Sequence, residues 1–162
     1  MDQEQLKDLI LKCWMTHDGM WFSHCIQEYG IESANKMNKA AIKSLAAIEI
    51  GRIRIAFGIE TIREFEELRK LTIAAFGVLT GSFMGFIYSF PAANILHWEM
   101  TKCFAYNGMK RLGVIDRYEC GVIYRVANWF DSLGIPYTLT PSVTGCMMHS
   151  RGFCSGEFHF FF

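Results

Sequence analysis

The sequence predicts an α+β protein in which an N-terminal helical layer packs on a small antiparallel sheet. Apolar side chains recur at three- and four-residue spacing through residues 1–80, as they do on the buried face of a helix. From residue 83 onward, short aromatic runs are bounded by Gly, Pro and Asn, which is typical of strands and hairpins. A chain of 162 residues suits one domain. We therefore expect a single domain over 1–162, with a helical part at 1–80 and a strand–helix–strand part at 83–162.

Four helices are expected in the helical part. Asp2 can cap the first, and Asp18-Gly19 begins or kinks the second, which Gly30 ends. A long third helix runs to about Phe57, and a capping box over 61–64 opens the fourth. The apolar positions that predict the first helix are Leu6, Leu9, Ile10, Cys13 and Trp14.

The second part is expected to hold two pairs of strands separated by two helices. Pro91–Asn94 supplies the turn of the first hairpin, and glycines end both helices. The expected segments are, in order, the strands Phe83–Phe90 and Ile95–Lys102, the helices Phe104–Leu112 and Arg117–Leu133, and the strands Tyr137–Val143 and Gly156–Phe162.

Charge and composition exclude several classes of protein. The formal net charge is zero with the two signs interleaved, so we expect no nucleic-acid partner. Leu71–Leu96 has no charged residue and is long enough to span a bilayer, but the turn residues at 80–82 favour a helix end followed by a strand, with no membrane partner. The first residues lack the apolar region of a secretory signal. We expect a cytoplasmic protein whose six cysteines are thiols.

Polar residues gather on one face of two expected strands. Because side chains alternate across a strand, His97, Glu99 and Cys103 share one face, and Glu157 and His159 share a face of the last strand. If both strands belong to one sheet, this face is either its solvent side or the floor of a pocket that the N-terminal helices cover.

Cysteine and histidine supply the candidate metal ligands. Cys103, Cys120, Cys146 and Cys154 are thiols that could bind zinc, although no Cys-x-x-Cys pair is present. They could equally be buried packing residues. Alternatively, Cys103 or Cys120 is a nucleophile, with His97, His149 or His159 as its base.

Two further groups have open interpretations. His17, Asp18 and His24 lie among aromatic residues, where Asp18 either orients a histidine or caps a helix. Arg52, with Arg54, either faces solvent or anchors an anionic ligand. Nucleotide-binding and zinc-protease motifs are absent from the sequence.

Three stretches of the second part resemble a known family. HWEMTKCFAYNGMKRLG, YECGVIYRVANWFDSLG and the closing GFCSGEFHF are similar to the L-2-amino-thiazoline-4-carboxylic acid hydrolase-like proteins, and more distantly to the 4-vinyl reductase small-molecule-binding domains. The resemblance implies a helical layer that holds a small molecule against a small sheet, and for the hydrolase the opening of a cyclic amidine by water. Cys103, Cys120 and Cys154 look like the recurrent cysteines of that group. The acidic residues that commonly follow the middle cysteine are replaced here by Gly-Val-Ile-Tyr.

Three functional hypotheses follow. In the first, a metal-assisted hydrolase holds zinc through Cys103, Cys120, Cys154 and His159, with His97 and Glu99 as catalytic groups. In the second, a sensor or carrier binds an apolar small molecule, with a structural metal or none. In the third, the apolar surface is a homodimer interface. The residues expected to contact a small-molecule ligand are Trp98, Phe86, Tyr88, Trp129 and Arg52.

Overall fold

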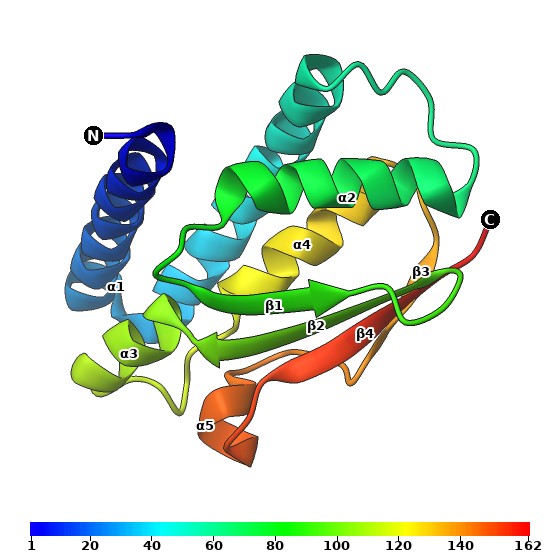
Figure 1. Ribbon diagram of the computed structural model, residues 1–162. Helices are drawn as coiled ribbons and strands as arrows, with labels where there is room; N and C mark the ends of the chain where they lie inside the picture. The colour runs from blue at the N-terminus through cyan, green and yellow to red at the C-terminus, as the bar shows by residue number, and fades with distance from the viewer.

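In the computed structural model, which describes residues 1–162, helices cover one face of a four-stranded antiparallel sheet (Figure 1). The α+β class is confirmed. The elements in chain order are α1 (Gln3–Ala56), α2 (Phe65–Leu79), β1 (Gly85–Ser89), β2 (Ile95–Lys102), α3 (Phe104–Arg111), α4 (Gly121–Ser132), β3 (Tyr137–Thr140), α5 (Met147–Arg151) and β4 (Ser155–Phe160).

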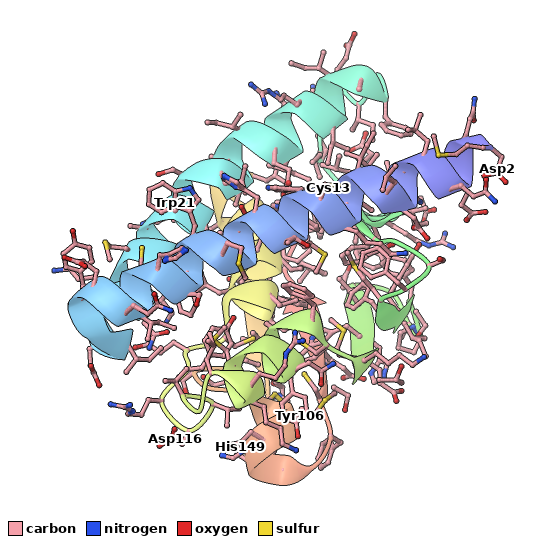
Figure 2. All side chains as sticks on the ribbon, turned by 90° about the vertical axis from the view of Figure 1, so that its left-hand side faces the viewer. Asp2, Cys13, Trp21, Tyr106, Asp116 and His149 are labelled. Carbon is pink, nitrogen blue, oxygen red and sulfur yellow. The ribbon has the colours of Figure 1, made fainter.

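The three helices predicted before residue 57 are two arms of α1. Asp2 caps the first arm and forms a capping box with Gln5, as the sequence predicts. The helix continues through Asp18-Gly19, but Gly30 has φ 78° and ψ 166°, which breaks the helical geometry. The first arm (residues 3–29) and the second arm (31–56) therefore diverge at Gly30, as Figure 2 shows.

The predicted start of α2 was three residues early. Glu64, not Thr61, is the extended N-cap residue. Its capping-box partner is Glu67, whose carboxylate accepts from the backbone N–H of Glu64 at 3.3 Å. Residues 61–63 therefore lie outside α2.

The sheet has the order β1-β2-β4-β3. Both predicted strand pairs form, and β4 lies between β2 and β3. β2 runs over Ile95–Lys102 as predicted. The other three strands are shorter than predicted; β3, for example, ends at Thr140, before Pro141, which has no N–H for the ladder. The helix predicted from Arg117 begins only at Gly121, and α5 was not predicted.

The uncharged stretch Leu71–Leu96 is divided between α2, β1 and the start of β2. This confirms the prediction of a helix end followed by a strand. None of the helices combines the length and the apolar character needed to cross a membrane.

The core lies between the sheet and the covering helices α1, α2 and α4. Aromatic rings fill it, with Phe130 and Phe158 at 5.1 Å between centroids. Because side chains alternate along β2 and β4, these strands present one buried face, here called the inner face. The central core residues are Ile50, Leu71, Phe76, Leu96, Trp98, Ile123, Trp129, Phe130, Phe158 and Phe160.

Two groups of polar contacts attach α4 and the segment just before it to α1. Glu49, at 8% exposure, accepts from Arg125 Nε at 2.9 Å and from Trp129 Nε1 at 2.8 Å. Asn35 donates to the carbonyl of Arg117 at 2.8 Å and accepts from the N–H of Glu119 at 3.2 Å. Glu49 and Asn35, the members of these contacts on α1, are both buried, so the contacts fix the position of α4 along α1.

Candidate functional site

Four cysteines from distant parts of the chain line one small pocket at the α3 and α5 end of the sheet. We call it the four-thiol pocket. Cys103 precedes α3, Cys120 precedes α4, Cys146 precedes α5 and Cys154 precedes β4. The cavity has a volume of about 20 Å³ and an apolar lining. The other lining residues are Met100, Ala105, Tyr106, Tyr118, Val122, Ile123, Met147 and Met148.

Backbone hydrogen bonds bring these segments together. The N–H of Cys120 donates to the carbonyl of Thr144 at 3.0 Å, beside a bridge between Glu119 and Gly145. The N–H of Met100 donates to the carbonyl of Cys154 at 2.8 Å. Tyr106 of α3 and His149 of α5 lie at the same end of the molecule (Figure 2). The pocket is thus built by main-chain pairing.

Three of the four thiols occupy helix N-caps. Cys103, Cys120 and Cys146 are the N-cap residues of α3, α4 and α5, and the Cys103 sulfur accepts from the N–H of Tyr106 at 3.5 Å. The N-terminus of a helix favours negative charge, so α3 and α4 favour the thiolate form of their caps.

Burial acts in the opposite direction. It raises the pKa of the Cys103 thiol, raises the pKa of Cys120 to about 11 and raises the pKa of Cys154 to about 12. Near neutral pH these three thiols are protonated. A ligand that requires thiolates must therefore displace protons from the pocket.

The donor set fits a soft metal ion in its chemistry, but its present geometry does not form a ready metal site. Thiol and thioether sulfurs suit zinc and cuprous copper, and a cavity of about 20 Å³ accommodates one water-sized occupant. No three of the His, Cys, Asp and Glu side chains are grouped closely enough to hold a metal ion as they stand. The four sulfurs share a pocket, and binding would have to draw them inward.

The predicted histidine and glutamate groups lie on the opposite face of the sheet from the four-thiol pocket. On this outer face Glu157 contacts His159 Nε2 at 2.9 Å and His97 Nδ1 at 3.6 Å. The three side chains are 36–39% exposed, and Glu99 is exposed. The prediction of a pocket floor covered by the N-terminal helices is wrong, because those helices cover the inner face.

His159 cannot join the thiols as a ligand. It follows Cys154 by five residues along β4, a distance of about 16 Å at the usual rise of a strand, and it points to the other face. The structure thus brings together the four thiols named as candidate ligands, Cys103, Cys120, Cys146 and Cys154. It separates His159, His97 and Glu99 from them.

The residues predicted to contact a small molecule are mainly core residues. Trp98 and Trp129 are 1% and 2% exposed, and the Trp98 indole N–H is buried without a partner. Phe86 and Tyr88 pack on Phe76 at 4.8 and 4.7 Å between centroids. These rings fill the space between helices and sheet, so the predicted pocket there is corrected to packed core. Arg52 is exposed on α1, which agrees with the solvent interpretation.

The cluster on the first arm of α1 is a surface feature. His17 and Asp18 lie 3.7 Å apart with side chains 69% and 59% exposed, and His24 is also exposed. Asp18 lies inside α1, so its interpretation as an N-cap is wrong. Cys13 and Cys25, on the same arm, do not line the four-thiol pocket.

A family model described as a family of unknown function (DUF6125) matches residues 1–132. No curated protein and no solved structure matches the chain. The matched span includes Cys103 and Cys120, whereas Cys146 and Cys154 follow it. Because the matching family has no known function and no curated protein matches, the resemblance to the hydrolase-like proteins stays a prediction.

Proposed function

The chain belongs to the DUF6125 family, and we propose that it binds one thiophilic metal ion, zinc in the first place, in the four-thiol pocket. The observation that supports this proposal is the convergence of Cys103, Cys120, Cys146 and Cys154 from four separate segments. Thiolates are the ligands of structural zinc sites. Three methionines in the same lining make cuprous copper the second ion to test.

A bound ion would serve structure or sensing better than hydrolysis. Four thiolates complete the tetrahedral coordination of zinc and leave no open position for water. A cavity of about 20 Å³ is also far below the roughly 300–1,000 Å³ of sites for organic ligands. His97 and Glu99, the predicted catalytic groups, lie on the other face of the sheet, so no observation favours the cyclic-amidine reaction.

The consequence of binding would be to join two parts of the chain. Cys103 and Cys120 belong to the span that the family model matches. Cys146 and Cys154 follow that span and lie in the segment that leads into β4, the strand between β2 and β3. An ion held by both pairs ties α3 and α4 to α5 and β4. Metal binding would then stabilise the fold by mass action, because the unfolded chain holds no preformed site.

We expect purified protein to take up one zinc ion per chain under reducing conditions, measured by elemental analysis after dialysis. Cys103→Ser and Cys120→Ser should each weaken binding by at least about a hundredfold, since a lost ligand removes a large share of zinc affinity. Serine is close to cysteine in size but adds a hydroxyl to an apolar pocket, so circular dichroism checks that each variant is folded.

Cys13→Ser and Cys25→Ser are the matched controls. Both positions lie on the first arm of α1, outside the pocket, and both variants should bind zinc like the parent. The proposal is overturned if the folded, reduced parent fails to bind zinc or cuprous copper, or if all four variants lose binding equally.

Zinc affinity is expected to rise with pH. Burial raises the pKa values of Cys103, Cys120 and Cys154 above the ordinary value of a thiol, so the thiols are protonated near neutral pH and binding releases their protons. Between about pH 6.5 and about pH 7.5, each released proton should increase the apparent affinity about tenfold per pH unit. Competition with a chromophoric chelator measures the slope. A flat profile would show that groups other than these thiols bind the ion.

A further inference from the structure

The second arm of α1 is apolar on two opposite sides. One side packs in the core through Ala46, Ile50 and Ile53. The other carries a row of uncharged side chains, here called the outer stripe: Met37, Ala41, Ser44, Ile48, Gly51 and Ile55. Its large members, Met37, Ile48 and Ile55, are 41%, 53% and 78% exposed. A helix that is apolar on opposite sides is normally covered on both.

The spacing of the outer stripe indicates that it packs against another helix. Its members alternate steps of four and three residues, which is the a and d repeat of a coiled coil. We propose that the outer stripe pairs in antiparallel orientation with the outer stripe of a second copy of this chain.

The stripe is self-complementary in this orientation. A two-fold axis near residue 46 places Met37 of one copy against Ile55 of the other. The same axis places Ala41 against Gly51 and Ser44 against Ile48. Each contact then occurs twice, which is the property of an isologous dimer interface. Every inner layer contains at least one small residue, Ala41, Gly51 or Ser44, which lets the two helices approach closely, and Met37 and Ile55 close the ends.

The flanking charges tolerate this arrangement. In the antiparallel register Arg52 faces Asn38 of the second copy, and Arg54 faces Ala40, so no arginines oppose each other. Lys36 and Lys43 flank the seam without facing it. The cations of the two arms still repel at long range, and salt should therefore strengthen the pairing. Binding of an acidic partner would weaken with salt.

The expected contact is of modest size. Residues 37–55 span about 28 Å of helix, which corresponds to an interface of roughly 1,000 Å² in total, at the low end for specific association. The end of α1 rises clear of α2 (Figure 1), and the exposure of Met37, Ile48 and Ile55 shows that this chain leaves the outer stripe accessible. The dimer should accordingly be reversible and dependent on concentration.

The experiment is sedimentation of the full chain from about 1 μM to about 500 μM, a range that brackets the affinity of small interfaces. We expect a monomer–dimer equilibrium that Ile48→Glu weakens about a hundredfold, because each dimer contains two copies of the change. Ile87→Glu is the matched control, since Ile87 is 54% exposed on β1 and Ile48 is 53% exposed. Ile10→Glu tests the apolar side of the first arm, where Ile10 is 57% exposed.

Cysteine cross-linking tests the orientation in a Cys13→Ser background. Ala47 of the two copies meet beside the two-fold axis, so Ala47→Cys should form a disulfide dimer on oxidation, whereas Met37→Cys should not. The proposal is overturned if the parent is monomeric throughout the range. It is also overturned if Ile10→Glu dissociates the dimer while Ile48→Glu leaves it intact, or if Met37→Cys cross-links in preference.

Discussion

Glu49→Ala is expected to lower the free energy of unfolding by about 3–5 kcal/mol, the usual cost of removing one partner of a buried ion pair. The carboxylate is 8% exposed and accepts from Arg125 Nε and Nη2 and from Trp129 Nε1. Without it, the guanidinium of Arg125 loses its partner in a site only 24% exposed. The indole N–H of a core residue loses its acceptor as well. Urea denaturation followed by circular dichroism measures the change.

An exposed ion pair of the same chemistry supplies the control. Glu66 and Arg69 lie 2.7 Å apart on α2 with side chains 51% and 42% exposed, so Glu66→Ala should cost about 0–1 kcal/mol. A double variant, Glu49→Met with Arg125→Met, should be more stable than Glu49→Ala, since no charge is then left unpaired. Equal effects of Glu49→Ala and Glu66→Ala would contradict the assignment of Glu49 as the buried anchor of α4.

Local patterns sufficed for most of the fold. The spacing of aromatic and turn residues predicts the hairpin of β1 and β2. Alternation along β2 correctly places His97 and Glu99 on one face of the strand. The break at Gly30 was predicted as a helix end, because a positive φ is accessible to glycine. The five-residue α5 was missed, since one and a half turns contain too few apolar positions to show a helical period.

The candidate site was predicted only in part, because its members are set by tertiary pairing. Alternation along β2 placed Cys103 on the face of His97 and Glu99. The strand ends at Lys102, however, and Cys103 is already the N-cap of α3, which turns it toward the four-thiol pocket. Nothing local indicates that Cys120 and Cys146 meet; the bond from Cys120 to Thr144 that joins them is long-range. Glu49 was missed for the same reason, since its partners lie on α4.

Gly156→Ala is expected to destabilise the protein by about 3 kcal/mol, the upper part of the range for overpacking a core position. Gly156 lies in β4, between β2 and β3, directly opposite Trp98. A Cβ atom there would lie 2.7 Å from the carbonyl oxygen of Thr140 and 2.8 Å from Trp98 Cζ2. Trp98 is 1% exposed, so its ring cannot move away from the added atom without displacing other core residues. The indole ring thus occupies the place of the missing side chain.

Gly108→Ala in α3 is the control for this change. A Cβ atom at Gly108 meets nothing within 4 Å, and alanine is the better helix former, so the variant should gain about 0.5–1 kcal/mol. Gly→Ala lowers the conformational entropy of the unfolded chain at either position. If Gly156→Ala lowers the free energy of unfolding while Gly108→Ala raises it, the loss at Gly156 comes from the lack of space in the folded state. If Gly156→Ala were neutral, Trp98 would have to be mobile in the core.

The origin of the clash can be tested with Trp98 itself. Trp98→Leu removes the indole and should cost about 3 kcal/mol alone through the cavity it leaves. In the Trp98→Leu background the added Cβ atom no longer clashes with the indole, so Gly156→Ala should destabilise the protein by about 1–2 kcal/mol less than in the parent. Such a coupling between two substitutions is expected only for residues in contact. The destabilisation that remains measures the clash between the added Cβ atom and the carbonyl oxygen of Thr140, whose backbone cannot move without shifting β3.

Gly156→Ala should also weaken zinc binding by the four-thiol pocket, because β4 begins just after Cys154 and would be displaced. Gly108→Ala should leave zinc binding unchanged.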